Sequence, residues 1–121
     1  MKTAKQIIGE KGETIALHYL QKKHFKIVAR NHRIGRAEVD IIAETEQHII
    51  FIEVKTRTTD AFGHPESFVT EKQKNILIEA AATYTTQYET LKPIRFDIVS
   101  ILMEPTKTTI SHFEDAFWPM A

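Results

Sequence analysis

Hydrophobic and polar residues follow two different spacings along this chain. From about Ala4 to Lys23, apolar positions recur at roughly helical intervals with lysines between them, which predicts an amphipathic helix. A second apolar series with helical spacing ends at Tyr88, and it follows Thr70 and Gln73, which have the spacing of a capping box. The pattern therefore predicts two helices, one at the start of the chain and one in its second half.

Runs rich in β-branched and aromatic residues lie before and after the second helix. The expected strands are Phe25 to Arg30, Ala37 to Glu44, His48 to Thr56, Ile94 to Leu102 and Thr108 to Phe113. The expected connections are the polar segments Asn31 to Arg36 and Thr45 to Gln47, and a loop from about Arg57 to Val69. The element order is then αβββαββ, that of an α/β protein.

Composition narrows the class of protein. The chain has 121 residues, of which 42% are hydrophobic and 26% are charged, and this length fits one globular domain over residues 1–121. It contains no cysteine, which excludes disulfides and thiolate metal sites and favours the cytoplasm. No run approaches the roughly 18 apolar residues of a membrane span. We therefore expect a soluble, cytoplasmic protein with no membrane partner.

Charge is divided between two parts of the chain, although the formal net charge is zero. Residues 1–36 carry nine Lys and Arg against two Asp and Glu, a net charge of +7, and residues 37–121 carry a net charge of −7. The basic part could supply a phosphate-binding face for a nucleic acid. The alternative is that its lysines form the solvated side of the first helix, and charge alone does not separate these two interpretations.

The segment FIEVKTRT places Glu53 and Lys55 on a strand that otherwise has the composition of a buried one. An antiparallel hairpin with the preceding strand, in which paired residue numbers sum to 93, places Asp40 opposite Glu53 and Glu38 opposite Lys55. Directly opposed side chains share a face of the sheet. We therefore expect these four charged side chains to project from one side of the sheet.

Two opposed carboxylates repel, so placing Asp40 opposite Glu53 would lower the stability of the fold unless a positive charge lies between them. Mg²⁺ or Mn²⁺ is the natural candidate, because these ions prefer hard oxygen ligands and keep positions for water and phosphate. Such an ion would polarise a scissile phosphate, while Lys55 orients the attacking water or neutralises charge on the phosphorane. The pattern therefore points to metal-dependent phosphodiester hydrolysis.

The run AEVDIIAE followed by FIEVKTRT resembles the PD-(D/E)xK nuclease signature, in which an Asp on one strand and an E-x-K on the next form a metal site. With KGETIALHYL, RNHR, FGHPESFVTEKQ, IRFDIVSI and the terminal AF, nearly the whole chain is similar to the YraN-like family of uncharacterised bacterial proteins. The resemblance implies a restriction-endonuclease-like fold, with a central mixed five-stranded sheet flanked by helices. It also implies kinship with archaeal Holliday junction resolvases.

The same resemblance implies the site and its partners. Resolvases of this kind add a glutamate from the first helix, and in this sequence Glu13 takes that place. The implied catalytic residues are Glu13, Asp40, Glu53 and Lys55, of which the first three are the ligands of Mg²⁺ or Mn²⁺. DNA is the implied partner, and the symmetric cutting by resolvases implies a homodimer. One departure is Ala37-Glu38, where the family usually has Gly-Glu. Alanine has less backbone conformational freedom than glycine, but every expected carboxylate is present.

Several other residues have both a possible functional role and an ordinary structural one. Arg57, Lys72 and Lys74 are candidates for contact with nucleic-acid phosphates, although each also fits an ordinary surface role. The six histidines show no metal-ligand spacing, so we assign them no site. The aromatic residues Phe113, Phe117 and Trp118 fit packing or a dimer contact better than base stacking.

Functions of different classes fit this sequence. The first is a metal-dependent endonuclease that acts on branched or otherwise structured DNA. The alternative is a catalytically inactive nucleic-acid-binding or adaptor module on the same fold, which the modest total charge favours, and a third is a structural interaction domain. The intact acidic residues favour the enzyme, because without a metal their charges repel. A one-residue shift of the hairpin register would place Asp40 and Glu53 on opposite faces and remove this physical basis.

Overall fold

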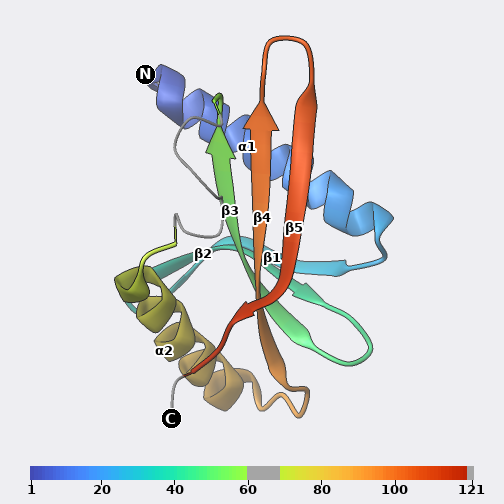
Figure 1. Cartoon of the computed structure of the whole chain (residues 1–121). Helices are drawn as coiled ribbons and strands as arrows, with labels where there is room; N and C mark the ends of the chain where they lie inside the picture. The colour runs from blue at the N-terminus through green and yellow to red at the C-terminus, as the bar shows by residue number, and fades with distance from the viewer. Residues whose placement is uncertain (60–68, 120–121) are drawn as a thin grey trace.

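The computed structural model describes residues 1–59 and 69–119. Its elements are helix α1 (Ala4–Lys22), strands β1 (Lys26–Ile34), β2 (Ala37–Glu44) and β3 (Ile49–Arg57), helix α2 (Glu71–Tyr88), and strands β4 (Ile94–Met103) and β5 (Thr108–Phe117). The order αβββαββ is the one that the sequence pattern predicts (Figure 1). The predicted α/β class is therefore confirmed.

The strands form one mixed sheet in the order β1-β2-β3-β4-β5. Neighbouring strands are antiparallel except β3 and β4, which are parallel and have α2 between them in the sequence. The hairpin of β2 and β3 has the predicted register, since Ile41 pairs with Ile52 and Glu44 with Ile49. This topology is consistent with a restriction-endonuclease-like fold.

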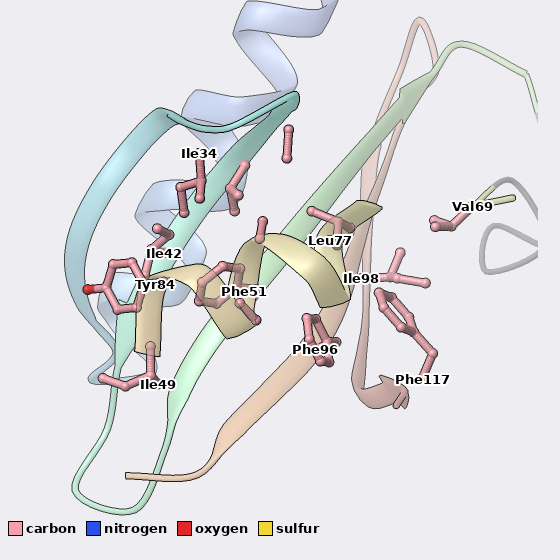
Figure 2. Close-up of a cluster of buried hydrophobic side chains, with 14 residues drawn as sticks. Ile34, Ile42, Ile49, Phe51, Val69, Leu77, Tyr84, Phe96, Ile98 and Phe117 are labelled. Carbon is pink, nitrogen blue, oxygen red and sulfur yellow. The ribbon is translucent and has the colours of Figure 1, made fainter. Parts of the chain in front are cut away.

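The two helices cover opposite faces of the sheet (Figure 1). Alternate residues of β3 divide between these faces: Ile50 and Ile52 belong to the buried cluster that includes Leu20 of α1. Phe51 belongs to the cluster under α2, where its ring lies 5.4 Å from that of Tyr84, centroid to centroid (Figure 2). Because both of its faces are buried, β3 is held firmly between the two helices.

Both helices begin with a capping box. In α2 the Thr70 hydroxyl accepts a hydrogen bond from the Gln73 backbone N–H, and the Gln73 side chain accepts one from the Thr70 N–H, as the sequence predicts. Thr3 and Gln6 make the same pair of hydrogen bonds at the start of α1. These bonds satisfy backbone donors that the first turn of a helix leaves open.

Helix α1 lies directly against β3 at Gly12. A Cβ atom added to this buried glycine would lie 1.8 Å from the Thr56 Oγ1 atom and 2.8 Å from the Thr56 Cβ atom. Real Cβ atoms do not approach other atoms so closely, so only glycine permits this contact between the helix and the strand. The helix is continuous through Gly9 and Gly12, although glycine weakens a helix interior.

Strand β1 corrects one expectation from the sequence. Asn31 to Arg36 was expected to be a polar connector, but β1 continues to Ile34 and only a short turn at Gly35 and Arg36 precedes β2. The polar side chains are tolerated because β1 is an edge strand with one largely exposed face. Asn31, within this strand, has a left-handed backbone with φ of 50°, a conformation that asparagine adopts more readily than most residues.

The C-terminal strand is also longer than expected. β5 was expected to end at Phe113 but continues to Phe117, whose buried ring stacks on that of Phe96 with centroids 4.9 Å apart. Phe113 packs against the same cluster, so the expectation of a packing role is confirmed for these two phenylalanines, while Trp118 is exposed. Tyr88, expected on the apolar face of α2, is half exposed.

The expected loop from Arg57 to Val69 lies mostly outside the described residues, and Arg57 itself belongs to β3.

In the described part of the chain, neither helix has the length and apolar character needed to cross a membrane.

Candidate functional site

Strands β2 and β3 separate beside the predicted site. Their ladder of paired residues ends at Ile41 and Ile52, and the next residue of β2, Asp40, is not part of it. Instead, the Oδ2 atom of Asp40 accepts a 2.8 Å hydrogen bond from the Val54 backbone N–H. Asp40 therefore connects the two strands through its side chain, and the backbone pairing of Asp40 with Glu53 expected from the sequence does not form.

A pocket of about 460 Å³ lies at this separation, between α1 and β3. Asp40 and Glu53 line it from the two strands, and Glu13 lines it from the helix. Glu13 reaches the pocket because its neighbour Gly12 lets α1 approach β3. The other lining residues are Lys5, Ile8, Gly9, Val54, Thr56, Arg57 and Thr58. We call this the carboxylate pocket; it brings together the three acidic residues implied by the sequence resemblance.

The two strand carboxyls are electrostatically linked. Burial, together with the negative charge of Glu53, raises the pKa of Asp40 from 3.8 to about 8. Burial also raises the pKa of Glu53, against the opposing effect of the Lys55 ammonium. At neutral pH the pair therefore retains a proton and does not carry two full negative charges. A cation bound between the two carboxylates would replace that proton.

Two of the three acidic residues each have a basic side chain beside them. The Lys55 Nζ atom lies 3.6 Å from the Glu53 Oε1 atom, and both side chains are largely buried. Lys55 is not among the described residues that line the carboxylate pocket, and its contact with the acidic residues is the ion pair with Glu53. The Arg30 Nε atom lies 3.7 Å from the Glu13 Oε1 atom. Burial raises the pKa of Glu13 more than the Arg30 charge lowers it.

The donor set fits a magnesium-type ion. Within residues 1–59 and 69–119, no three or more His, Asp or Glu side chains form a ready-made set of metal ligands. Mg²⁺ does not require such a set, because it is usually held by one or two carboxylates and keeps several waters. Asp40 and Glu53 supply hard oxygen atoms, and a cation would relieve their repulsion. Glu13 is then a third carboxylate at the edge of the site.

The predicted phosphate-contacting residues lie in different surroundings. Arg57 lines the carboxylate pocket. Lys74 forms an ion pair with Glu71 at 3.2 Å and lies over the Phe117 ring, 5.8 Å from its centroid. Lys72 is exposed on α2, and neither lysine is among the described residues that line the pocket. Only Arg57 is therefore close to the acidic residues.

Glu38 does not join the cluster in the way that the hairpin register predicts. Its carboxylate lies 3.4 Å from Arg33 of the neighbouring strand β1, and the side chain is exposed. The separation of β2 from β3 removes the expected pairing of Glu38 with Lys55. Glu38 still lies near the other acidic residues, because it lines a neighbouring pocket together with Glu53 and its charge helps to raise the pKa of Glu13. The third carboxylate that lines the carboxylate pocket is Glu13 and not Glu38.

Several residues that the structure places at the site were not predicted individually from the sequence. Lys5 and Gly9 lie on the same stripe of α1 as Glu13, and their spacing of four residues was the available signal. Thr56 contacts Gly12 and lines the pocket, but no sequence pattern indicates this contact.

A second group of charged residues lies elsewhere on the sheet. Asp97 is fully buried and accepts two hydrogen bonds of 2.9 Å from Arg95 and one of 3.0 Å from the Asp115 backbone N–H. The His112 Nε2 atom lies 2.7 Å from the Asp97 Oδ2 atom. Burial by itself would raise the pKa of Asp97, but the hydrogen bonds with His112 and Arg95 outweigh burial and lower it. These contacts join β4 to β5, and we assign them a structural role.

The fold and the pocket define an α/β protein with an acidic pocket where two strands of a mixed sheet separate. Residues 12–101, which include all four implied catalytic residues, match the family described as "Uncharacterised protein family UPF0102". A UPF0102 protein of Christiangramia forsetii is 42% identical over 111 residues, covering 92% of this chain and 93% of the relative. The chain therefore belongs to the UPF0102 family, which confirms the YraN-like resemblance.

Other relatives match the chain to a similar extent. A UPF0102 protein of Phocaeicola vulgatus is 41% identical over 111 residues, covering 92% of both chains. A UPF0102 protein of Chlorobium phaeobacteroides is 39% identical over 124 aligned positions, covering 97% of this chain and 98% of the relative. These alignments extend over nearly the whole chain, so the similarity is not limited to the segment around the carboxylate pocket.

Proposed function

We propose that this protein is a metal-dependent endonuclease that hydrolyses phosphodiester bonds in DNA, with branched or otherwise structured DNA as its substrate. The observation that carries the proposal is the buried acidic pair of Asp40 and Glu53, in which the pKa of Asp40 is raised to about 8. Two buried carboxylates that repel each other lower the stability of a fold, whereas a Mg²⁺ or Mn²⁺ site requires them. Strongly shifted carboxyl pKa values in a pocket are also typical of active sites.

Asp40 and Glu53 would hold the metal ion, with Glu13 as an additional carboxylate from α1. A bound divalent cation supplies positive charge to the scissile phosphate and makes a bound water more acidic. The hydrogen bond from the Val54 N–H holds the Oδ2 atom of Asp40 and fixes the orientation of its carboxylate. The strand backbone therefore positions one of the two principal ligands before any substrate binds.

Lys55 and Glu13 have distinct roles in this proposal. The Lys55 ammonium, paired with Glu53 at 3.6 Å, keeps a positive charge beside the site that orients the attacking water or offsets charge on the phosphorane. Burial raises the pKa of Glu13, so its carboxyl holds a proton to a higher pH than an exposed glutamate does. This property suits Glu13 to proton exchange with water in the carboxylate pocket.

The proposal is tested by cleavage of a labelled panel of duplex, single-stranded, flap and four-way-junction DNA with Mg²⁺ or Mn²⁺. The native protein is compared with Asp40→Asn and Lys55→Ala. Glu46→Gln, in the turn between β2 and β3, and Lys22→Ala, at the end of α1, are matched controls outside the pocket. We expect metal-dependent cutting by the native protein and both controls, no cutting by Asp40→Asn, and cutting slowed by about 100-fold or more in Lys55→Ala.

A different result would favour the alternative function. If no substrate is cut, and DNA binding is independent of metal and survives both site substitutions, the fold serves recognition and the endonuclease proposal is wrong. Thermal unfolding with and without Mn²⁺ separates the two cases further. A metal site at Asp40 predicts a rise in Tm with Mn²⁺ that Asp40→Asn abolishes and Glu46→Gln retains.

A further inference from the structure

One wall of the carboxylate pocket is a single stripe of helix α1. Lys5, Gly9 and Glu13 are spaced by four residues, so they lie one above another on the same side of the helix, and all three line the pocket. At 1.5 Å of rise per residue, the Cα atoms of Lys5 and Glu13 are about 12 Å apart along the helix axis. The stripe thus leads from the acidic site to a lysine near the start of the helix.

Gly9, in the middle of this stripe, has no packing reason to be a glycine. A Cβ atom added to Gly9 would meet no other atom within 4 Å, in contrast to Gly12, where it would collide with Thr56. Glycine is unfavourable in a helix interior compared with alanine. The missing side chain leaves the helix wall bare between Lys5 and Glu13, where a ligand chain would have room to lie close to the backbone.

The charges around the pocket indicate what such a ligand is. Three carboxylates repel a polyanion, so a substrate with many phosphates needs cations beside the site. Lys5 supplies one from the helix wall, and Arg57 lies on the facing strand β3. Lys5 has no ion pair with the described residues, whereas Lys2, on the same end of the chain, pairs with Glu10 at 2.8 Å.

We propose that Lys5 binds a backbone phosphate of a nucleic-acid strand that passes over Gly9, next to the phosphate held at the acidic residues. This inference rests on the proposed function and deepens it, because it assigns the path of the substrate to α1 and not to α2. The lysines of α2, Lys72 and Lys74, are not among the described residues that line the pocket.

The test measures DNA binding at several salt concentrations in the cleavage-inactive Asp40→Asn protein, with a labelled flap or junction oligonucleotide as the probe. Loss of one phosphate contact lowers the slope of log K against log salt by about 0.7 to 0.9, and weakens binding about five- to eightfold at 0.1 M salt. We expect this change for Lys5→Ala. We expect no change for Lys11→Ala, which removes the same charge from an exposed position of α1 outside the carboxylate pocket.

A second variant separates binding from folding. Gly9→Gln introduces a better helix former into open space, so it should raise the Tm while it weakens DNA binding severalfold. Equal salt slopes for Lys5→Ala and Lys11→Ala, unchanged binding by Gly9→Gln, or no salt-dependent binding by the Asp40→Asn protein would each overturn the inference. Because the readout is binding, Lys5-dependent binding without any cutting by the native protein would overturn the endonuclease proposal alone.

Discussion

Gly12 of α1 and Thr56 of β3 touch so closely that a Cβ atom on the glycine would lie 1.8 Å from the threonine hydroxyl oxygen. This contact places Glu13 in the carboxylate pocket. Gly12→Ala should push the helix away from the strand and destabilise the protein by about 1–3 kcal/mol, as overpacking does. It should also reduce metal-dependent cutting, because Glu13 moves with the helix. Chemical denaturation and the cleavage assay measure the two effects.

Gly9→Ala is the matched control for this prediction, since nothing lies within 4 Å of its added Cβ atom. It should leave stability unchanged or raise it by up to about 1 kcal/mol. Thr56→Gly removes the three atoms nearest to the new Cβ, so Gly12→Ala should cost less stability in that background. An equal cost in both backgrounds would show that the contact does not fix the position of the helix.

The raised pKa of Asp40 predicts how stability depends on pH in the absence of metal. Its pKa of about 8 in the folded protein is above the ordinary value of 3.8, so the folded state holds this proton more tightly. Its contribution to stability is full below about pH 4 and is lost as the pH rises through 8. The native protein should therefore be less stable at pH 9 than at pH 5 in EDTA, by an amount on the order of a few kcal/mol.

Asp40→Asn should remove much of this dependence. The asparagine side chain carries no charge and keeps an oxygen that can accept the Val54 N–H, so the variant should be more stable than the native protein at pH 9. Urea denaturation at several pH values makes the comparison, with Glu46→Gln as a control for an exposed carboxylate. Parallel stability curves for native and Asp40→Asn proteins would contradict the assignment of the buried proton.

Lys55 is predicted to act in catalysis and not in metal binding. Its ammonium pairs with Glu53 but is not among the described residues that line the pocket, so Lys55→Ala leaves both strand carboxylates in place. We expect kcat to fall by about 100-fold or more, the typical cost of removing one electrostatic contact in a transition state. The rise in Tm with Mn²⁺ should persist. Loss of that rise, with cutting retained at high metal concentration, would instead show that Lys55 supports the metal ligands.

The buried Asp97 is predicted to stabilise the fold without a part in the chemistry. It holds Arg95 and the Asp115 backbone, and lies 2.7 Å from the His112 Nε2 atom. Asp97→Asn should destabilise the protein by about 3–5 kcal/mol, because it leaves a largely buried arginine without its closest charged partner. The part of the protein that remains folded should cut DNA at the native rate.

Because the pKa of Asp97 is lowered, its contribution to stability depends on pH in the direction opposite to that of Asp40. A carboxyl with a pKa below its ordinary 3.8 contributes stability that is present above about pH 4 and is lost as the pH falls through the folded-state value. The native protein should therefore lose part of its stability in acid, and Asp97→Asn should lose less. An acid titration followed by circular dichroism tests this; identical titrations of the two proteins would show that Asp97 is not the responsible group.

The sequence by itself determined the element order and the β2–β3 register. Ile41, Ile50 and Ile52 must all face the helix α1, and a shift of one residue would turn the whole apolar set to the other face of the sheet. This constraint made the neighbourhood of Asp40 and Glu53 predictable from residue spacing. The capping box at Thr70 was predictable for a similar reason, since its hydrogen bonds are local.

Only the tertiary structure decided how the site is completed. Where β2 separates from β3, Asp40 accepts a hydrogen bond from the Val54 N–H. This contact joins two strands, so the periodicity of neither strand predicts it. The position of Glu13 in the carboxylate pocket depends on the close contact of Gly12 with Thr56. The alignment of Lys5, Gly9 and Glu13 along the pocket depends on the direction in which α1 crosses the sheet. Periodicity records which face of an element is buried, whereas the position of one element over another is fixed by packing between residues far apart in the chain.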